Sequence, residues 1–150
     1  MRLLRIARRK WDVLAVLSGQ DRCQVIDFLT EHCGQNPDEQ DLTTFENACA
    51  LMLGLIREHI PVHGAPEKMP LCKPLGGGLF EFRKQPSGDK LRVTWFRDNK
   101  MVICVLAFSK RSTRETKPRD AVNKSRKLKK TYFEDKRRSQ IVIEQIPEGR

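Results

Sequence analysis

The stretch LFEFRKQPSGDKLRVTWF, residues 79–96, decides the fold of this chain. Hydrophobic and polar residues alternate on both sides of the turn signal Pro86-Ser87-Gly88-Asp89, as they do in two antiparallel strands joined by a turn. An apolar run follows the short turn Asp98-Asn99-Lys100. The pattern predicts an antiparallel meander of three strands, at 79–85, 91–97 and 101–109.

Each of the first two strands carries an arginine, Arg83 or Arg92. Successive side chains of a strand point to opposite faces of the sheet. If the aromatic residues of these strands are buried against helices, Glu81, Arg83 and Arg92 emerge together on the other face. There, either arginine could pair with Glu81 across the strands, or the arginines could bind an anionic ligand.

The segments before the meander predict one strand and two helices. Residues 11–17 form a short apolar run typical of a strand, and 20–34 have apolar residues at helical spacing. The stretch 41–59 predicts a second helix, which we expect Pro61 to end. Residues 61–78 are rich in proline and glycine and predict an irregular connection.

The two ends of the chain are basic. Residues 1–17 loosely imitate a signal peptide, but Trp-Asp interrupts the apolar stretch and no cleavage site follows, so we interpret residues 1–10 as a basic lead-in to the first strand. Lys117-Pro118 is expected to open a basic helix of about 20 residues, because proline suits a first helical turn. The tail, 139–150, is expected to be flexible or to form a short strand.

The order strand, helix, helix, three strands, helix indicates an α+β fold. We expect a single domain over 1–150, with an antiparallel four-stranded sheet, two N-terminal helices on one face and a C-terminal basic helix. The second face of the sheet is expected to stay open.

Charge and cysteine content narrow the class of protein. The formal net charge is +10 in 150 residues. Residues 1–10 hold five basic and no acidic residues, and residues 101–150 hold 14 basic and six acidic ones. This distribution favours a polyanion such as nucleic acid, although a merely basic soluble protein is the alternative. Five cysteines without a CxxC pair predict reduced thiols and a cytoplasmic protein, and no apolar run predicts a membrane partner.

The meander resembles the core of the RelE/HigB toxin superfamily, particularly its phage-derived HigB-like branch. That branch reads K-x-L-x-x-G-L-x-E-L-R, then R-V-x-Y-F, then an apolar strand ending in F-x-K-K. The corresponding residues here are Lys73-Pro74-Leu75, Gly78-Leu79-Phe80-Glu81-Phe82-Arg83, Arg92-Val93-Thr94-Trp95-Phe96 and Phe108-Ser109-Lys110-Arg111. The resemblance covers roughly residues 11–138.

This resemblance implies the toxin of a type II toxin–antitoxin system, with a small microbial-ribonuclease-type fold. Such toxins are endoribonucleases that enter the A site of the 30S ribosomal subunit and cut the messenger RNA there. The implied partners are messenger RNA, the ribosome and a cognate antitoxin, often a helix-turn-helix protein. No cofactor is implied. The alternative is a non-catalytic nucleic-acid-binding or phage host-takeover module on the same fold.

Metal-free RNA cleavage requires activation of the 2′-hydroxyl, neutralisation of the phosphorane and protonation of the leaving oxygen. We assign charge neutralisation to Arg92 and Arg111, because a guanidinium can bind two phosphate oxygens. Arg83 and Lys110 would position the RNA backbone. Glu81 is either the general base or an orienting partner of Arg92, since the lysine pair that some family members carry on this strand is missing.

Further residues are predicted to contact RNA. Tyr132 either stacks on a base or packs in the core. The C-terminal helix is either a solvated charged helix, a phosphate-binding surface or a docking surface for an acidic antitoxin segment. The cations predicted to bind RNA are Lys73, Arg114, Lys124, Lys127 and Lys130.

A metal site is not expected. His59 and His63 are four residues apart near Cys72, but Pro61 lies between the histidines and is expected to break the helix that would align them. No second cysteine stands at ligand spacing.

Overall fold

The protein is described here by a computed structural model, which covers residues 1–33, 44–67, 71–84, 91–109 and 118–146. The strands are β1 (Arg2–Arg8), β2 (Asp12–Val16), β3 (Cys72–Gly76), β4 (Leu79–Lys84), β5 (Leu91–Asp98), β6 (Met101–Ser109) and β7 (Val142–Gln145). The helices are α1 (Gln24–His32), α2 (Thr44–Gly54), the π-helical turn η1 (Leu55–His59), α3 (Ile60–His63) and α4 (Pro118–Arg137).

The strands form one mixed sheet of seven strands in the order β3-β4-β5-β6-β2-β1-β7. The predicted meander is confirmed, because β4, β5 and β6 pair antiparallel in sequence order. The predicted antiparallel four-stranded sheet is wrong. Strand β2 pairs parallel with β6, β7 pairs parallel with β1, and β3 adds an antiparallel edge to β4.

Three of the seven strands lie in segments that were not predicted firmly as strands. The basic lead-in is strand β1, which pairs antiparallel with β2. Strand β3 lies within the segment predicted as irregular, and β7 lies in the tail. Each of them is short or rich in charged, proline or glycine residues, so its own sequence carries little strand signal.

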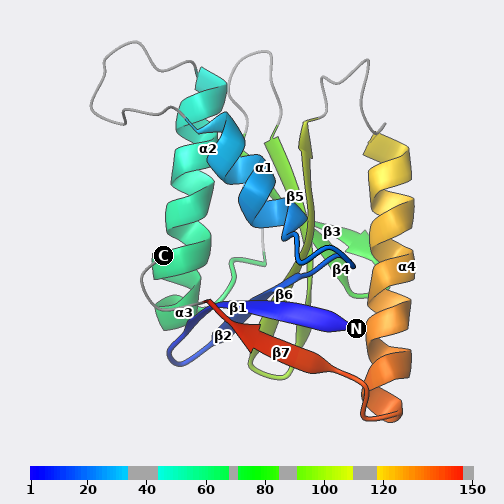
Figure 1. Cartoon of the computed structure of the whole chain (residues 1–150). Helices are drawn as coiled ribbons and strands as arrows, with labels where there is room; N and C mark the ends of the chain where they lie inside the picture. The colour runs from blue at the N-terminus through cyan, green and yellow to red at the C-terminus, as the bar shows by residue number, and fades with distance from the viewer. Residues whose placement is uncertain (34–43, 68–70, 85–90, 110–117, 147–150) are drawn as a thin grey trace.

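Helices cover both faces of the sheet (Figure 1). On one face α1 and α2 bury an apolar cluster that includes Phe82, Val93 and Trp95. On the other face α4 packs over a second cluster, which includes Phe96, Phe108, Ala121 and Tyr132. The prediction of an open second face is therefore wrong, because the basic C-terminal helix occupies it.

The helical segment after α2 continues past Pro61. Residues Leu55–His59 form a π-helical turn, and α3 follows with Pro61 in its first turn. The helical path passes the proline by way of this π-helical turn, in which the Ile60 N–H bonds to the carbonyl of Leu55, five residues back, as π-helical insertions in α-helices do. The helical path ends only at Gly64, which has a φ of 83°. The predicted helix end at Pro61 is wrong for this reason.

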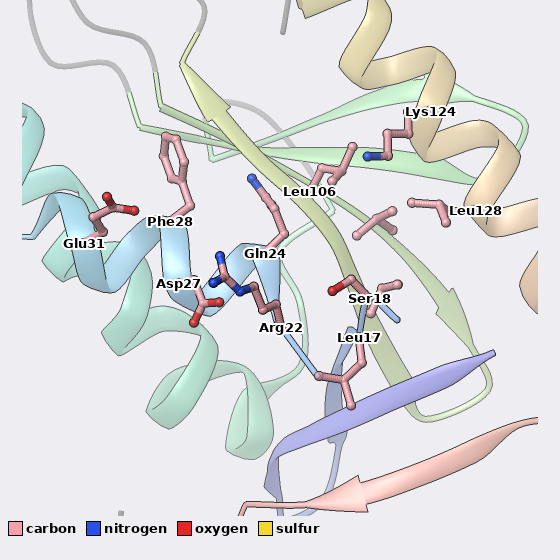
Figure 2. A pocket seen from close by; sticks show the side chains of 12 residues that line it. Leu17, Ser18, Arg22, Gln24, Asp27, Phe28, Glu31, Leu106, Lys124 and Leu128 are labelled. Atoms are coloured by element: carbon pink, nitrogen blue, oxygen red, sulfur yellow. The ribbon is translucent and has the colours of Figure 1, made fainter. Parts of the chain in front are cut away.

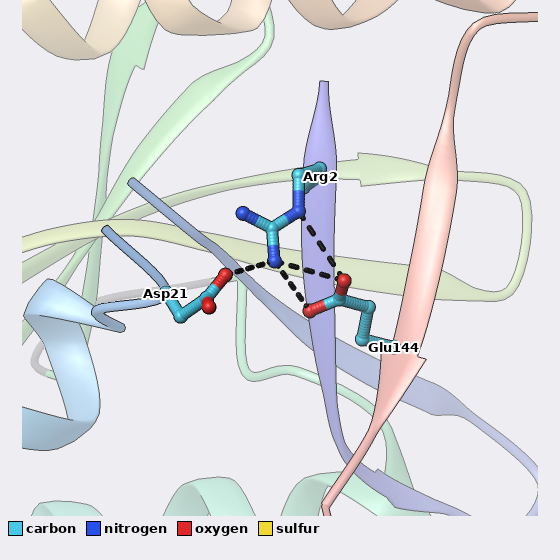
Figure 3. A network of polar contacts seen from close by, with 3 residues as sticks. All are labelled: Arg2, Asp21 and Glu144. Atoms are coloured by element: carbon cyan, nitrogen blue, oxygen red, sulfur yellow. Dashed lines mark hydrogen bonds and ion pairs between the residues drawn. The ribbon is translucent and has the colours of Figure 1, made fainter. Parts of the chain in front are cut away.

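An ion-pair network joins the two outermost strands at the β7 edge of the sheet (Figure 3). Arg2 on β1 donates from Nη2 to both carboxylate oxygens of Glu144 on β7, at 2.8 and 2.9 Å. The same guanidinium also contacts Asp21. These contacts join β7 to β1 across their parallel register.

Among the described helices, none is both long and apolar enough to cross a membrane.

Candidate nucleic-acid interface

Glu81, Arg83 and Arg92 lie together on β4 and β5, on the side of the sheet that faces α4. The strand register places Glu81 opposite Thr94 and Arg83 opposite Arg92. Arg92 Nε lies 3.0 Å from Glu81 Oε1, and Arg83 Nε lies 3.4 Å from the same oxygen. One carboxylate thus holds two guanidinium groups, and we call these three residues the arginine cluster.

The arginine cluster is largely buried. Arg92 has no exposed surface, Glu81 is 2% exposed, and the Arg83 side chain is 11% exposed. The predicted exposure of all three residues on an open face is therefore wrong. The direct phosphate contact predicted for Arg92 is not possible in this arrangement, whereas Arg83 reaches the surface.

A hydroxyl pair joins α4 to β5 at Thr94, the residue that pairs with Glu81 in the strand register. The side-chain oxygens of Thr94 and Ser125 lie 2.7 Å apart, and Ser125 donates to the carbonyl of Ala121 at 2.8 Å. The same Thr94 hydroxyl accepts a hydrogen bond from the backbone N–H of Leu106, next to the irregularity in the β5–β6 register. These buried bonds lock α4, β5 and β6 in one arrangement.

The arginine cluster holds three charged groups close together with little access to water, and this affects the pKa of Arg92. Burial lowers the pKa of Arg92, Arg83 lowers it further, and Glu81 opposes both effects. The Arg92 guanidinium nevertheless stays protonated, because arginine does not lose its proton in proteins. With one carboxylate and two guanidinium groups, the arginine cluster carries a net charge of +1. Such an excess of positive charge is suited to an anionic ligand at the exposed side, where Arg83 lies.

The remaining predicted catalytic cations, Lys110 and Arg111, lie outside the described residues, as does Arg114. Ser109 ends β6 and pairs with Leu91, the residue before Arg92. The last described residue of β6 therefore lies beside the start of β5, one position before Arg92. The assigned roles of Lys110, Arg111 and Arg114 stay predictions.

The other predicted RNA contacts that the structure describes lie on β3 and α4. Lys73 is an exposed residue of β3 that pairs with Glu81 in the strand register. Lys127 and Lys130 are exposed on α4. Lys124 lines a cavity of about 420 Å³ between α1, β6 and α4, together with Arg22, Leu106 and Leu128 (Figure 2). The RNA contacts of these lysines stay predictions.

Tyr132 is a core residue. It is 1% exposed, its ring packs against Phe96, and its hydroxyl donates to Asp98 at 2.7 Å. Burial, and then the hydrogen bond to Asp98, raise the pKa of Tyr132 well above its ordinary value. The base-stacking alternative is wrong for this arrangement, because α4 turns the ring towards the sheet.

The sequence reasoning overlooked two cations of α4 that face the β3–β4 hairpin. Arg126 donates to the carbonyls of Leu75 and Gly76 at 2.6 and 3.0 Å, and Lys129 lies beside Gly78. Their spacing of three residues puts them on the same side of a helix. The run Gly76-Gly77-Gly78, which allows a close approach, was the available signal.

The histidines do share one helical face, contrary to prediction. The ring centroids of His59 and His63 lie 4.6 Å apart, because the helical path continues through Pro61. No group of three or more His, Cys, Asp or Glu residues suited to a metal occurs within the described residues. Burial raises the pKa of the Cys23 thiol to about 11 and that of the Cys49 thiol to about 12, which disfavours the thiolate at these two positions.

A family model described as phage derived protein Gp49-like matches residues 42–137. The chain belongs to the phage-derived Gp49-like family. The matched range contains the arginine cluster, the strands β3 to β6 and the whole of α4, and it leaves out β1, β2, α1 and β7. No match was found among curated proteins or among solved structures. The narrower placement in the RelE/HigB superfamily stays a prediction.

Proposed function

We propose that this Gp49-like protein is the toxin of a type II toxin–antitoxin system and that it cuts messenger RNA. The observation that carries the proposal is the arginine cluster, in which the buried Glu81 carboxylate holds two guanidinium groups. The Gp49-like family is associated with toxin–antitoxin systems, which supports the toxin assignment.

In the proposed reaction the 2′-hydroxyl of the RNA loses its proton and attacks the adjacent phosphate without a metal. The bond from phosphorus to the 5′-oxygen breaks, that oxygen takes a proton, and a 2′,3′-cyclic phosphate remains. Arg83 contacts the phosphate, because its side chain is the part of the arginine cluster that reaches the surface. A pre-placed guanidinium stabilises the charge that develops on the phosphorane, and this is usually the largest catalytic contribution of a site. Lys110 and Arg111, which follow β6 in the sequence, supply the other cations in this proposal.

Glu81 and Arg92 are positioning residues in this proposal. Glu81 lies between the two arginines, so it fixes the direction of the Arg83 side chain. Arg92 lies behind Glu81 and holds the carboxylate in place. The second role predicted for Glu81, that of a general base, stays a prediction.

Two partners complete the proposed function. The ribosome would present the translated message, and a cognate antitoxin would hold the protein inactive. Both partners are expected to complement a strongly basic surface, since the net charge is +10. Ribosomal RNA is a polyanion, and an antitoxin would need an acidic contact segment.

The test is induced expression with mapping of new 5′ ends in cellular messenger RNA. Wild type is expected to arrest growth and to produce new cuts within translated regions. Arg83→Ala should reduce cutting by about 100-fold or more, because one donor to the transition state is lost. Arg97→Ala is the matched control, since Arg97 lies on β5, is 46% exposed and pairs with Glu67, away from the arginine cluster.

The outcomes separate the proposal from its alternative. Arg83→Lys keeps the charge but loses the planar fork, so partial cutting is expected from a folded protein. If folded wild type is present and neither arrest nor cutting occurs, the catalytic proposal fails. A non-catalytic nucleic-acid-binding module then takes its place.

A further inference from the structure

The tip of the β3–β4 hairpin has an unusual backbone. Gly76 pairs with Leu79, so Gly77 and Gly78 form a two-residue connection. Their φ values are 65° and 80°, and Gly76 has a φ of 89°. Positive φ at both central residues is the requirement of a type I′ turn, which favours glycine. We call these three residues the glycine tip.

The glycine tip presents unused hydrogen-bond donors. Gly76, Gly77 and Gly78 are all exposed. In the part of the chain that the structure describes, no acceptor takes a hydrogen bond from the amide N–H of Gly77 or Gly78. Successive backbone N–H groups in such a turn can form an anion-binding concavity.

Two cations of α4 stand directly beside these donors (Figure 1 shows the hairpin against α4). Arg126 Nη1 lies 3.8 Å from the position that a Cβ atom would take at Gly77, and Lys129 Nζ lies 3.6 Å from that position at Gly78. Arg126 also holds the hairpin through the carbonyls of Leu75 and Gly76. Lys129 lies over the Phe133 ring, at 5.2 Å from the centroid.

Neither cation is neutralised within the described residues, because no ion pair links Arg126 or Lys129 to a carboxylate there. Arg126 has a structural role, since its guanidinium fastens the hairpin to α4. Lys129 makes no hydrogen bond to the described residues. Its ammonium group is therefore available to a ligand, at a place where the glycine tip adds backbone donors.

We propose that the glycine tip and Lys129, with Arg126 behind them, bind a phosphate group of an RNA backbone. A phosphate offers several strong acceptor oxygens, which match two N–H donors and one ammonium group. That the anion belongs to RNA rests on the proposed function.

The site would anchor RNA at a distance from the arginine cluster. Arg83 lies five positions after Gly78, which corresponds to about 17 Å along the strand. Lys73 is exposed on the neighbouring strand β3, opposite Glu81. Lys73 therefore lies beside the arginine cluster, on the same hairpin that carries the glycine tip.

The test measures binding of a 2′-O-methylated single-stranded RNA of about 12 nucleotides by fluorescence anisotropy. This RNA lacks the attacking hydroxyl, so it cannot be cut by the proposed reaction. Lys129→Ala should raise Kd about 5- to 10-fold and reduce the slope of log K against log salt by about 0.7. Lys129→Arg should stay within about twofold of wild type, because the charge is retained.

Arg137→Ala is the matched control. Arg137 is exposed on the last turn of α4, and its loss lowers the net charge by the same amount. We expect it to change Kd by less than about twofold. Thermal unfolding of each variant checks that the hairpin and α4 remain folded.

Equal weakening by Lys129→Ala and Arg137→Ala would overturn the proposal, since only the net charge would then matter. An unchanged Kd in Lys129→Ala, or no binding by wild type, would also overturn it. Binding that depends on Lys129 without cutting of unmodified messages would refute the proposed function alone. If the protein cuts messages but Lys129→Ala does not change its RNA binding, only this inference is refuted.

Discussion

Two arginine–carboxylate networks stand at different places in the same sheet, and they differ in their contact with water. The arginine cluster is buried under α4, and its Glu81 carboxylate holds two arginines. The network of Arg2, Asp21 and Glu144 lies at the outer edge, where one arginine contacts two carboxylates and the side chains are 35%, 75% and 39% exposed. The second network can be satisfied by water when a partner is removed, whereas the first cannot. Similar ion pairs therefore have different consequences for stability, and mutation can measure the difference.

The largest effect is expected from Glu81→Ala. This change leaves two buried guanidinium groups without their shared carboxylate, and removing one partner of a buried ion pair costs about 3–5 kcal/mol. The free energy of unfolding, measured by urea denaturation, should fall by that amount. Glu144→Ala in the exposed network is the control and should change the midpoint far less. Similar losses in both variants would contradict the difference drawn between the networks.

A moderate effect is expected from Tyr132→Phe on the same face. The change removes a buried hydroxyl that donates to Asp98 at 2.7 Å and retains the ring. The free energy of unfolding should fall by about 1–3 kcal/mol, because the charged acceptor Asp98 loses a buried hydrogen-bond donor. Unfolding in urea measures the loss. An unchanged midpoint would show that water replaces the hydroxyl, contrary to the burial of this site.

The acid stability of the protein should depend on Asp98. Burial alone would raise the pKa of Asp98, but hydrogen bonds from Lys136 and Tyr132 and the charge of Lys136 outweigh it, so the pKa is lowered. A lowered pKa in the folded protein gives stability that is present above the unfolded value and is lost as the pH falls through the folded value.

Asp98→Asn should therefore flatten the loss of stability between about pH 5 and pH 2. Thermal unfolding midpoints across this range measure the effect, with Asp21→Asn as a control on an exposed carboxylate. If the two variants have the same pH profile as wild type, the stabilising contacts of Asp98 with Lys136 and Tyr132 have no energetic weight.

The smallest effect is expected from Arg2→Ala in the exposed network. Its ion pairs are screened by salt and exchange readily for water. The thermal midpoint at moderate salt should stay close to that of wild type, and any loss at low salt should shrink as salt is added. A large loss that is insensitive to salt would show that Arg2 acts through the packing of β1 against β7 instead.

The sequence predicted those parts of the fold whose pattern is local. Alternation around the turns placed β4, β5 and β6 almost at their observed bounds, and Lys117-Pro118 marked the start of α4 to the residue. Strand β1 escaped prediction because it looks like a basic lead-in, and β7 was only one of two alternatives for the tail. The parallel pairs join distant segments, as in Arg2 with Val142. Such pairing depends on tertiary structure and leaves no local signal.

The sequence predicted which residues form the candidate site, but it did not predict that they are buried. Glu81, Arg83 and Arg92 do come together, as alternation requires, yet they do so beneath α4. The sequence of that helix is basic almost all round, although Ala121, Ser125 and Tyr132 are buried. Two of these three residues are small and carry little hydrophobic signal, so the sequence did not reveal that α4 covers this face.

The most direct test of RNA cleavage by the arginine cluster is an analysis of the ends produced from a defined message in a reconstituted translation system. The proposal predicts new 3′ ends that carry a 2′,3′-cyclic phosphate, made by wild type and Arg97→Ala but reduced about 100-fold or more in Arg83→Ala. Replacing the nucleotide before the cut by its 2′-deoxy form should abolish that cut. The proposal would be contradicted if folded wild type made no cuts. It would also be contradicted if the cuts left 3′-hydroxyl ends and were unchanged in Arg83→Ala.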